Sequence, residues 1–208
     1  MIRKRFGKII LALCLSTVLF IAPAGAAEVR VLALGDSLTA GLGVMPEQAW
    51  PPVVQDLLNQ AGKSEVRVLN AGISGSTSAS APGRVRWHLK TRPDILVLAL
   101  GANDGLRGLP VKEMQKNLDT AIGLAKEAGV KVILAGMEVP PNYGEDYAKA
   151  FRQVFVALAE ARHLPFIPFL LDGVAGNPAL NQADGIHPTA DGQKIVARTV
   201  LPYILEAL

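Results

Sequence analysis

The sequence holds a single cysteine, Cys14, which lies in the apolar N-terminal segment. Without Cys14 the remaining chain has no thiol chemistry, no disulfide bond and no cysteine-based zinc site. It also lacks a Gly-x-Ser-x-Gly pentapeptide, the nucleophile elbow of the α/β-hydrolases, and a glycine-rich phosphate loop. No group of histidines and acids has the spacing of metal ligands, so we expect neither a metal nor a cofactor.

Positive charge is scarce beyond the N-terminus. Four of the 21 lysines and arginines lie within residues 3–8, and removing them leaves 17 basic against 18 acidic residues, a net charge of −1. The chain has no basic stripe and no aromatic residues interleaved with basic ones. This composition excludes nucleic acid as the expected partner.

The N-terminus has the order of segments found in secretory signal peptides. Its basic start is followed by an apolar run at 9–21, which is short for a membrane span, and by small residues at 22–27. We predict a signal peptide at 1–26, cleaved before Ala27 or before Glu28, with an uncleaved anchor as the alternative. The mature bacterial protein would be periplasmic or secreted, with no stable membrane anchor.

Half of the residues are hydrophobic, and the chain is long enough for one domain, which we place at 27–208 and expect to be a monomer. Five β-rich runs alternate with segments of helical period. The predicted strands are Val29–Leu34, Val66–Leu69, Ile95–Leu100, Val130–Ala135 and Phe166–Phe169. The predicted helices are Trp50–Ala61, Arg84–Lys90, Val111–Ala128, Tyr147–Ala161 and a last one capped by Thr189.

Alternation of strands and helices favours parallel strands joined by right-handed crossovers. The predicted fold class is therefore α/β, as a three-layer α/β/α sandwich around a flavodoxin-like five-stranded parallel sheet. In open sheets of this kind, ligands bind beyond the carboxyl ends of the strands. That rule singles out the segments 35–37, 70–72, 101–104 and 137–143.

Polar residues in and near these segments have the chemistry of serine hydrolysis. Ser37 directly follows the first strand, and His187 lies in an Asp-Gly-Ile-His-Pro run three residues after Asp184. A serine nucleophile, a histidine base and an orienting acid form a catalytic triad. The amides of Ser37 and Gly72 and the side chain of Asn103 could form the oxyanion hole. Taken singly, each of these residues also fits an ordinary turn or helix cap.

Together these blocks resemble the SGNH hydrolases, also called the GDSL lipase/esterase family. That family is named for a Ser, a Gly, an Asn and a His in four blocks, which here would be Ser37, Gly72, Asn103 and His187, with Asp184 in the Asp-x-x-His block. The runs Gly-Asp-Ser-Leu-Thr-Ala-Gly, Asn-Asp-Gly-Leu-Arg-Gly and Pro-Asn-Tyr-Gly are similar to its branch of bacterial thioesterases, lysophospholipases and arylesterases.

The resemblance implies the SGNH hydrolase fold and the hydrolysis of small acyl esters or thioesters through an acyl-enzyme, with lysophospholipid as a further candidate substrate. Leu106 and Leu109 follow Asn103 and could cover an acyl chain or simply pack down. Glu138 is an unexpected charge in this region; it either faces solvent or disfavours anionic substrates such as acyl-CoA. The expected substrate-binding residues are Asp36, Leu38, Asp104, Leu106, Leu109, Val139, Pro140 and Tyr143.

Two other functions remain open at this point. The first is a periplasmic carbohydrate O-acetyl esterase, which would prefer short acyl groups. The second is a non-catalytic binding module on the same fold, although an intact set of Ser, Gly, Asn, Asp and His speaks against it. The natural acyl donor and its chain length do not follow from the sequence.

Overall fold

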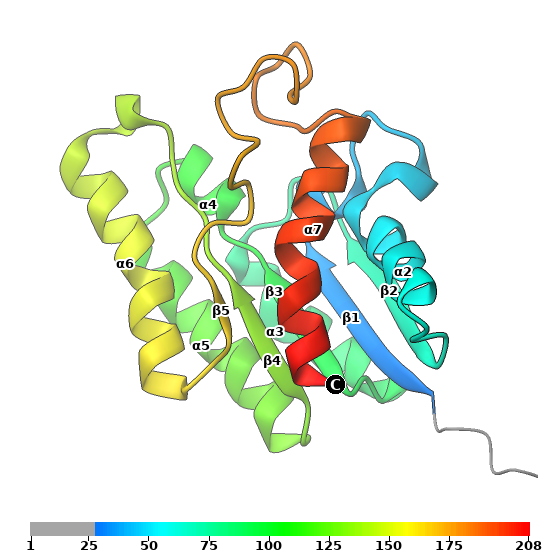
Figure 1. The fold of residues 1–208 in the computed structure, drawn as a ribbon. Coiled ribbons are helices and arrows are strands. Elements are labelled where there is room, and N and C mark those ends of the chain that lie inside the picture. The colour runs from blue at the N-terminus through cyan, green and yellow to red at the C-terminus, as the bar shows by residue number, and fades with distance from the viewer. Residues whose placement is uncertain (1–27) are drawn as a thin grey trace, which may run out of the picture.

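The structure, a computed structural model, describes residues 28–208 and has one parallel sheet at its centre (Figure 1). The sheet order is β2-β1-β3-β4-β5, and each neighbouring pair is parallel. The strands are β1 (Val29–Gly35), β2 (Val66–Gly72), β3 (Ile95–Ala99), β4 (Lys131–Ala135) and β5 (Phe166–Ile167). This order confirms the predicted flavodoxin-like sheet. The predicted signal peptide lies outside the described residues.

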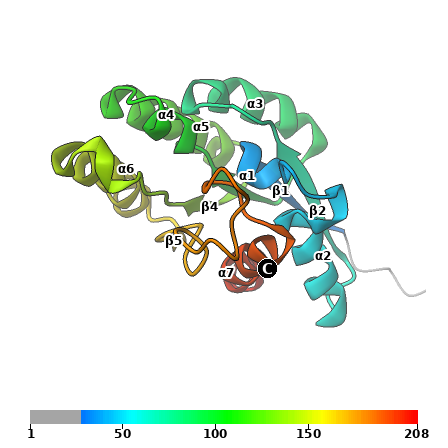
Figure 2. The ribbon, with the colours of Figure 1, turned by 90° about the horizontal axis from the view of Figure 1, so that it is seen from above.

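Helices cover both faces of the sheet, as the view from above shows (Figure 2). One face carries α2 (Trp50–Gln60) and α7 (Ala190–Ala207), which pack against each other. The other face carries α3 (Ala81–His88), α5 (Val111–Glu127) and α6 (Glu145–Arg162). The three-layer α/β/α sandwich predicted from the sequence is therefore confirmed.

Short helices occupy the loops at the carboxyl end of the sheet. Helix α1 (Ser37–Ala40) directly follows β1, and α4 (Ala102–Leu106) follows β3. Residues 28–208 also contain four single turns of 3-10 helix, at Pro46–Gln48, Ser78–Ser80, Leu89–Thr91 and Pro141–Tyr143, of which Leu89–Thr91 lies at the other end of the sheet, before β3. No helix within residues 28–208 is long and apolar enough to cross a membrane.

Several boundaries differ from the sequence prediction. Strand β2 continues through Asn70, Ala71 and Gly72, because these residues pair with the last three residues of β1. Strand β5 ends at Ile167, where Pro168 offers no N–H for the ladder. The segment after β3, predicted as a loop, begins with the helical turn of α4.

The apolar core lies directly beneath the loops that follow the strands. All five residues of β3 are buried, and Phe151 and Phe155 of α6 pack with their rings 5.4 Å apart. Gly101 lies between this core and α4 with φ of +125°, and a Cβ atom there would lie 2.8 Å from the Phe155 ring. A side chain at this position is therefore disfavoured by both backbone and space.

Gly101→Ala should destabilise the protein by about 1–3 kcal/mol, because the backbone conformation is strained for alanine and the ring of Phe155 must move. Gly123→Ala is the matched control: it lies inside α5 with no atom within 4 Å of the new methyl group, so helix propensity should stabilise it by about 0.5–1 kcal/mol. Urea unfolding measures both. A Gly101→Ala variant as stable as wild type would contradict this account.

Candidate active site

Ser37, His187 and Asp184 meet above the carboxyl end of β1. The Nε2 atom of His187 lies 2.9 Å from the Oγ atom of Ser37, and its Nδ1 atom lies 2.7 Å from Oδ2 of Asp184. The second oxygen of Asp184 accepts the backbone N–H groups of Ile186 and His187, each at 3.0 Å. The turn thus folds the carboxylate back onto the imidazole.

The charge of Asp184 is well stabilised. The hydrogen bond from the His187 ring, followed by the two backbone hydrogen bonds, lowers the pKa of Asp184 to about 2. The carboxylate therefore stays ionised at neutral pH and accepts from Nδ1 of His187, which leaves Nε2 free to take a proton from Ser37.

Two glutamines fix the His187 loop relative to the nucleophile. The Gln182 amide donates to the carbonyl oxygens of Leu42, at 2.7 Å, and Pro188, at 3.0 Å. The buried Gln193 of α7 accepts the Trp50 N–H and donates to the carbonyl of Leu38, next to Ser37. The chain on both sides of His187 is therefore fastened to α1 and to the residues that follow it.

Two hydrogen-bond donors stand beside the nucleophile. The N–H of Ser37 is at the first position of α1, where a helix leaves its amides unpaired. The Nδ2 atom of Asn103, in α4, donates to the Ser76 carbonyl at 3.1 Å and to Oδ2 of Asp36 at 3.3 Å. The second of these contacts is long, so it is weak and easily shared with a further acceptor.

The contacts of Gly72 do not fit the role of oxyanion donor that was expected for its N–H. Its N–H donates to the Asn70 side chain at 2.9 Å, and a Cβ at Gly72 would collide with the backbone of Ala40. It packs against α1 and is not among the residues that line the cleft described next. Gly75, three residues later, lines that cleft with φ of +77°, and within residues 28–208 its N–H has no acceptor.

A cleft of about 730 Å³ opens beside Ser37, Asn103 and His187. Four of the expected substrate-binding residues line it: Leu38, Leu106, Val139 and Pro140. Met137, at the start of the segment 137–143 that the sequence singled out, lines it too. Sequence analysis did not assign to substrate binding four further large apolar residues of its walls, which are Leu42, Phe169, Leu171 and Ile186. The cleft is therefore mostly apolar, with Ser37, Asn103 and His187 among its polar residues.

Two acidic residues assigned to substrate binding are instead buried supports. Asp36 is 1% exposed, caps α1 by accepting the Leu38 N–H, and does not line the cleft. Asp104 is 3% exposed and accepts both the N–H and the hydroxyl of Ser78, at 2.7 and 2.6 Å. These bonds tie α4 to the segment that carries Gly75, because Ser78 lies just beyond it.

Leu109 and Tyr143 do not line the cleft either. The Leu109 carbonyl accepts the Tyr147 hydroxyl at 2.9 Å, and the Tyr143 hydroxyl donates to the Leu106 carbonyl at 2.8 Å. Both tyrosines therefore fasten the segment after α4 to the start of α6. The Tyr143 bond holds the backbone of Leu106, a residue that lines the cleft.

Comparison with known proteins decides the family. Residues 33–195 match the GDSL-like Lipase/Acylhydrolase family. The chain belongs to this family. It is 40% identical to esterase TesA of Pseudomonas aeruginosa, covering 94% of this chain and 96% of that one. It is 37% identical to thioesterase 1/protease 1/lysophospholipase L1 of Escherichia coli, with 83% and 81% covered. The protein is thus a carboxylic ester hydrolase.

The solved structures agree with this assignment. A crystal structure of TesA superposes with a TM-score of 0.83 at 39% identity, covering 86% of this chain and 99% of that one. The SGNH hydrolase fold expected from the sequence resemblance is therefore confirmed. Apart from the element boundaries noted above, this GDSL-family hydrolase differs from the sequence expectation in the environments of Asp36, Gly72, Asp104, Leu109 and Tyr143.

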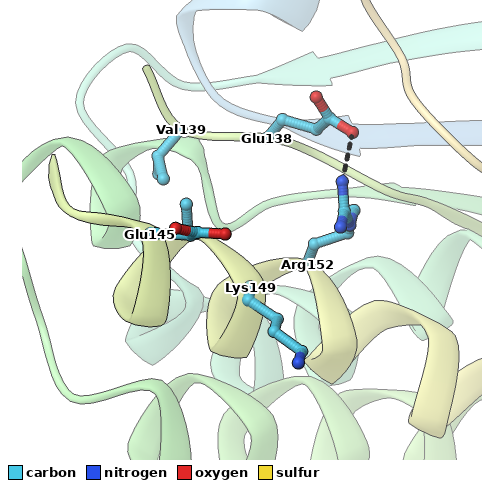
Figure 3. Close-up of a pocket in the computed structure, with 6 residues that line it drawn as sticks. Glu138, Val139, Glu145, Lys149 and Arg152 are labelled. Carbon is cyan, nitrogen blue, oxygen red and sulfur yellow. Dashed lines mark ion pairs between the residues drawn. The ribbon is translucent and has the colours of Figure 1, made fainter. Parts of the chain in front are cut away.

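Glu138 lies at the border between the cleft and a second hollow of about 420 Å³, formed with the first turns of α6 (Figure 3). The side chains of Glu138 and Arg152 point toward each other, with 3.6 Å between Oε1 and Nη1. Both are exposed, so the pair is weak. Glu138 thus faces solvent, one of the two possibilities that the sequence left open, and the neighbouring cation partly offsets its charge.

Asp36→Asn should change how stability depends on pH. Burial raises the pKa of Asp36 from 3.8 to about 6, so between these values the folded protein binds more protons than the unfolded chain. The contribution of Asp36 to stability therefore falls as pH rises toward 6 and above. The unfolding free energy of D36N minus that of wild type should therefore be about 1.4 kcal/mol more positive at pH 7.5 than at pH 5. Urea unfolding at both pH values measures it, and equal differences would contradict the raised pKa.

Proposed function

We propose that this hydrolase cleaves carboxylic esters and thioesters through a Ser37–His187–Asp184 triad and an acyl-enzyme intermediate. The observation that carries the proposal is the 2.9 Å contact between His187 Nε2 and Ser37 Oγ, with Asp184 on the other ring nitrogen. A nucleophile, a base and an orienting acid in this sequence of contacts form the geometry of serine hydrolases on several unrelated folds.

In the first step His187 Nε2 takes the Ser37 proton while Oγ attacks the substrate carbonyl. The tetrahedral intermediate collapses as the imidazolium returns that proton to the departing alcohol or thiol, leaving the acyl group on Ser37. Water then attacks this ester while His187 takes its proton, and the imidazolium returns that proton to Oγ of Ser37 as the bond to the acyl group breaks and the carboxylic acid leaves. Asp184 stays ionised throughout and stabilises the transient imidazolium.

The proposed oxyanion hole consists of the N–H groups of Ser37 and Gly75 and the Nδ2 of Asn103. Gly75 replaces Gly72 in this proposal, because Gly72 donates to Asn70, whereas the Gly75 amide borders the cleft and has no acceptor in the described part of the chain. Arg107 supports the Gly75 segment by donating to its carbonyl at 2.9 Å. Preorganised donors of this kind stabilise the charge that develops on the carbonyl oxygen.

Asn103→Ala should lower kcat for p-nitrophenyl butyrate by about 100- to 1000-fold, the usual loss when one oxyanion donor is removed. KM should change little, because the donor acts on the transition state. Gly72→Ala cannot serve as a control, since its methyl group would collide with α1. Arg152→Gln can, because it lies outside the catalytic contacts, and it should keep kcat within about twofold. Turnover of the Asn103→Ala variant near the wild-type value would remove Asn103 from the proposed hole.

The apolar walls of the cleft suit the acyl chain of the substrate. Leu106 and Val139 stand with Phe169 and Leu171 around a space of about 730 Å³, within the size of a small-molecule site. The thioesterase and lysophospholipase named among the relatives supports thioesters and lysophospholipids as candidate substrates. An apolar lining offers few partners for sugar hydroxyls, which makes a carbohydrate O-acetyl esterase the weaker proposal.

Leu106→Ala should shorten the preferred acyl chain. Its side chain lines the cleft, so truncation removes contacts that only a longer chain makes, at about 0.8 kcal/mol for each methylene that loses its burial. The ratio of kcat/KM for p-nitrophenyl octanoate to that for the acetate should fall by about 4-fold or more. Leu109→Ala is the control, because Leu109 lies on the same segment outside the lining and should leave the ratio unchanged. An unchanged ratio in Leu106→Ala would place the acyl chain elsewhere.

We further propose that the protein acts as a monomer in the periplasm or outside the cell. Export is supported by the basic, apolar and small-residue order of the first 26 residues, which lie outside the described part of the chain. Cell fractionation with an N-terminal sequence of the mature protein tests the cleavage before Ala27 or Glu28.

A further inference from the structure

The proposed triad and oxyanion hole leave one buried carboxylate unexplained. Asp36 is 1% exposed and lies directly between Ser37 and the end of β1. Its Oδ1 accepts the Leu38 N–H at 3.0 Å, and its Oδ2 is 3.3 Å from Nδ2 of Asn103. It touches neither the imidazole of His187 nor the cleft, so it is not part of the reacting groups.

Capping α1 does not account for a charged residue at this position. Serine, threonine or asparagine would accept the Leu38 N–H as well as aspartate does, because N-cap preferences for these residues are similar. A buried carboxylate carries a desolvation cost that those residues avoid. The capping interaction uses only one of the two oxygens, so the reason for the charge lies with the second oxygen and its partner, Asn103.

We propose that Asp36 is a positioning residue for Asn103 and fixes which end of its amide is offered to the substrate. This inference rests on the proposed oxyanion hole. The Asn103 nitrogen meets two acceptors, Oδ2 of Asp36 and the Ser76 carbonyl. An amide turned by 180° would place its oxygen against both acceptors and would present an acceptor to the developing oxyanion. The Asp36 carboxylate makes that orientation repulsive.

The contact of 3.3 Å also allows Asn103 to change partner. It is longer than the usual N–H···O distance, and the Ser76 contact of 3.1 Å is stronger. When negative charge develops on the substrate oxygen, the N–H that points toward Asp36 can be shared with it while the Ser76 bond keeps the amide in place. Asp36 thus orients the Asn103 N–H through a weak hydrogen bond, which leaves that N–H able to donate to the substrate oxygen as well.

The charges around Asp36 agree with this role. Burial raises the pKa of Asp36 to about 6, and the hydrogen bonds from Leu38 and Asn103 and the charge of His187 offset this rise only in part. The charge of Asp36 in turn acts to raise the pKa of the nearby Arg84, against the stronger lowering by burial. Arg84 donates to the carbonyls of Gly35 and Ala71 at the ends of β1 and β2. Above pH 6 the carboxylate is therefore a pure acceptor facing the Asn103 amide.

A double-mutant cycle separates this role from capping. Asp36→Asn keeps an oxygen for the Leu38 N–H but turns an NH₂ group toward the NH₂ group of Asn103. With p-nitrophenyl butyrate at pH 7.5, D36N should lower kcat by about 10-fold or more and leave KM within about twofold. In the Asn103→Ala background, the same D36N change should alter kcat less than twofold, because the group through which it acts is gone.

Asp36→Ser supplies a second variant, because serine can cap α1 but places no NH₂ group against the NH₂ group of Asn103. It should lose less kcat than D36N, and its loss should also vanish in the Asn103→Ala background. Thermal unfolding of each variant establishes that the fold is kept.

Two results would overturn the proposal. One is wild-type kcat in D36N, and the other is an equal loss from D36N in both backgrounds, which would mean that Asp36 acts through α1 and Ser37. Failure of the oxyanion hole itself gives a different result, because Asn103→Ala alone would then keep its turnover.

Discussion

A hydrogen bond of 2.9 Å between Ser37 and His187 joins residues 150 positions apart, and the proposed chemistry depends on it. The parallel sheet brings the two residues together, because β1 ends two residues before Ser37 and α7 begins three residues after His187. Gln193 then connects α7 to Leu38 in α1 and to Trp50 at the start of α2. The fold positions the base relative to the nucleophile through these buried contacts, while the loop that carries His187 and Asp184 stays at the surface.

Two carboxylates close to the reacting serine have opposite environments. Asp184 is partly exposed, and hydrogen bonds from His187 and two backbone amides hold its pKa near 2. Asp36 is buried beneath α1, and desolvation raises its pKa to about 6. The first supports a positive charge that forms on the imidazole, whereas the second faces the amide of Asn103. Environments that separate the pKa values of neighbouring acids are a feature of catalytic sites.

The sequence predicted the residues that belong to short motifs and missed those that depend on packing. Ser37, Asp184 and His187 follow from strand ends and from an Asp-x-x-His turn, whose spacing is local. Asn70 to Gly72 were expected to follow the second strand, but they pair with β1 and extend it. The glycine amide without an acceptor among residues 28–208 is therefore that of Gly75 rather than Gly72. The burial of Asp104 against Ser78 depends on a contact across 26 residues, which no local pattern indicates. Apolar residues such as Phe169 and Leu171 join the cleft only when the chain is folded.

Covalent labelling tests the central claim most directly, because a fluorophosphonate reacts with a serine whose proton a neighbouring base removes. Intact-mass and peptide analysis after labelling should find one adduct per chain, on Ser37, and the rate should fall by at least about 1000-fold in His187→Ala. Labelling of a different serine, or of Ser37 at the wild-type rate without His187, would contradict the account.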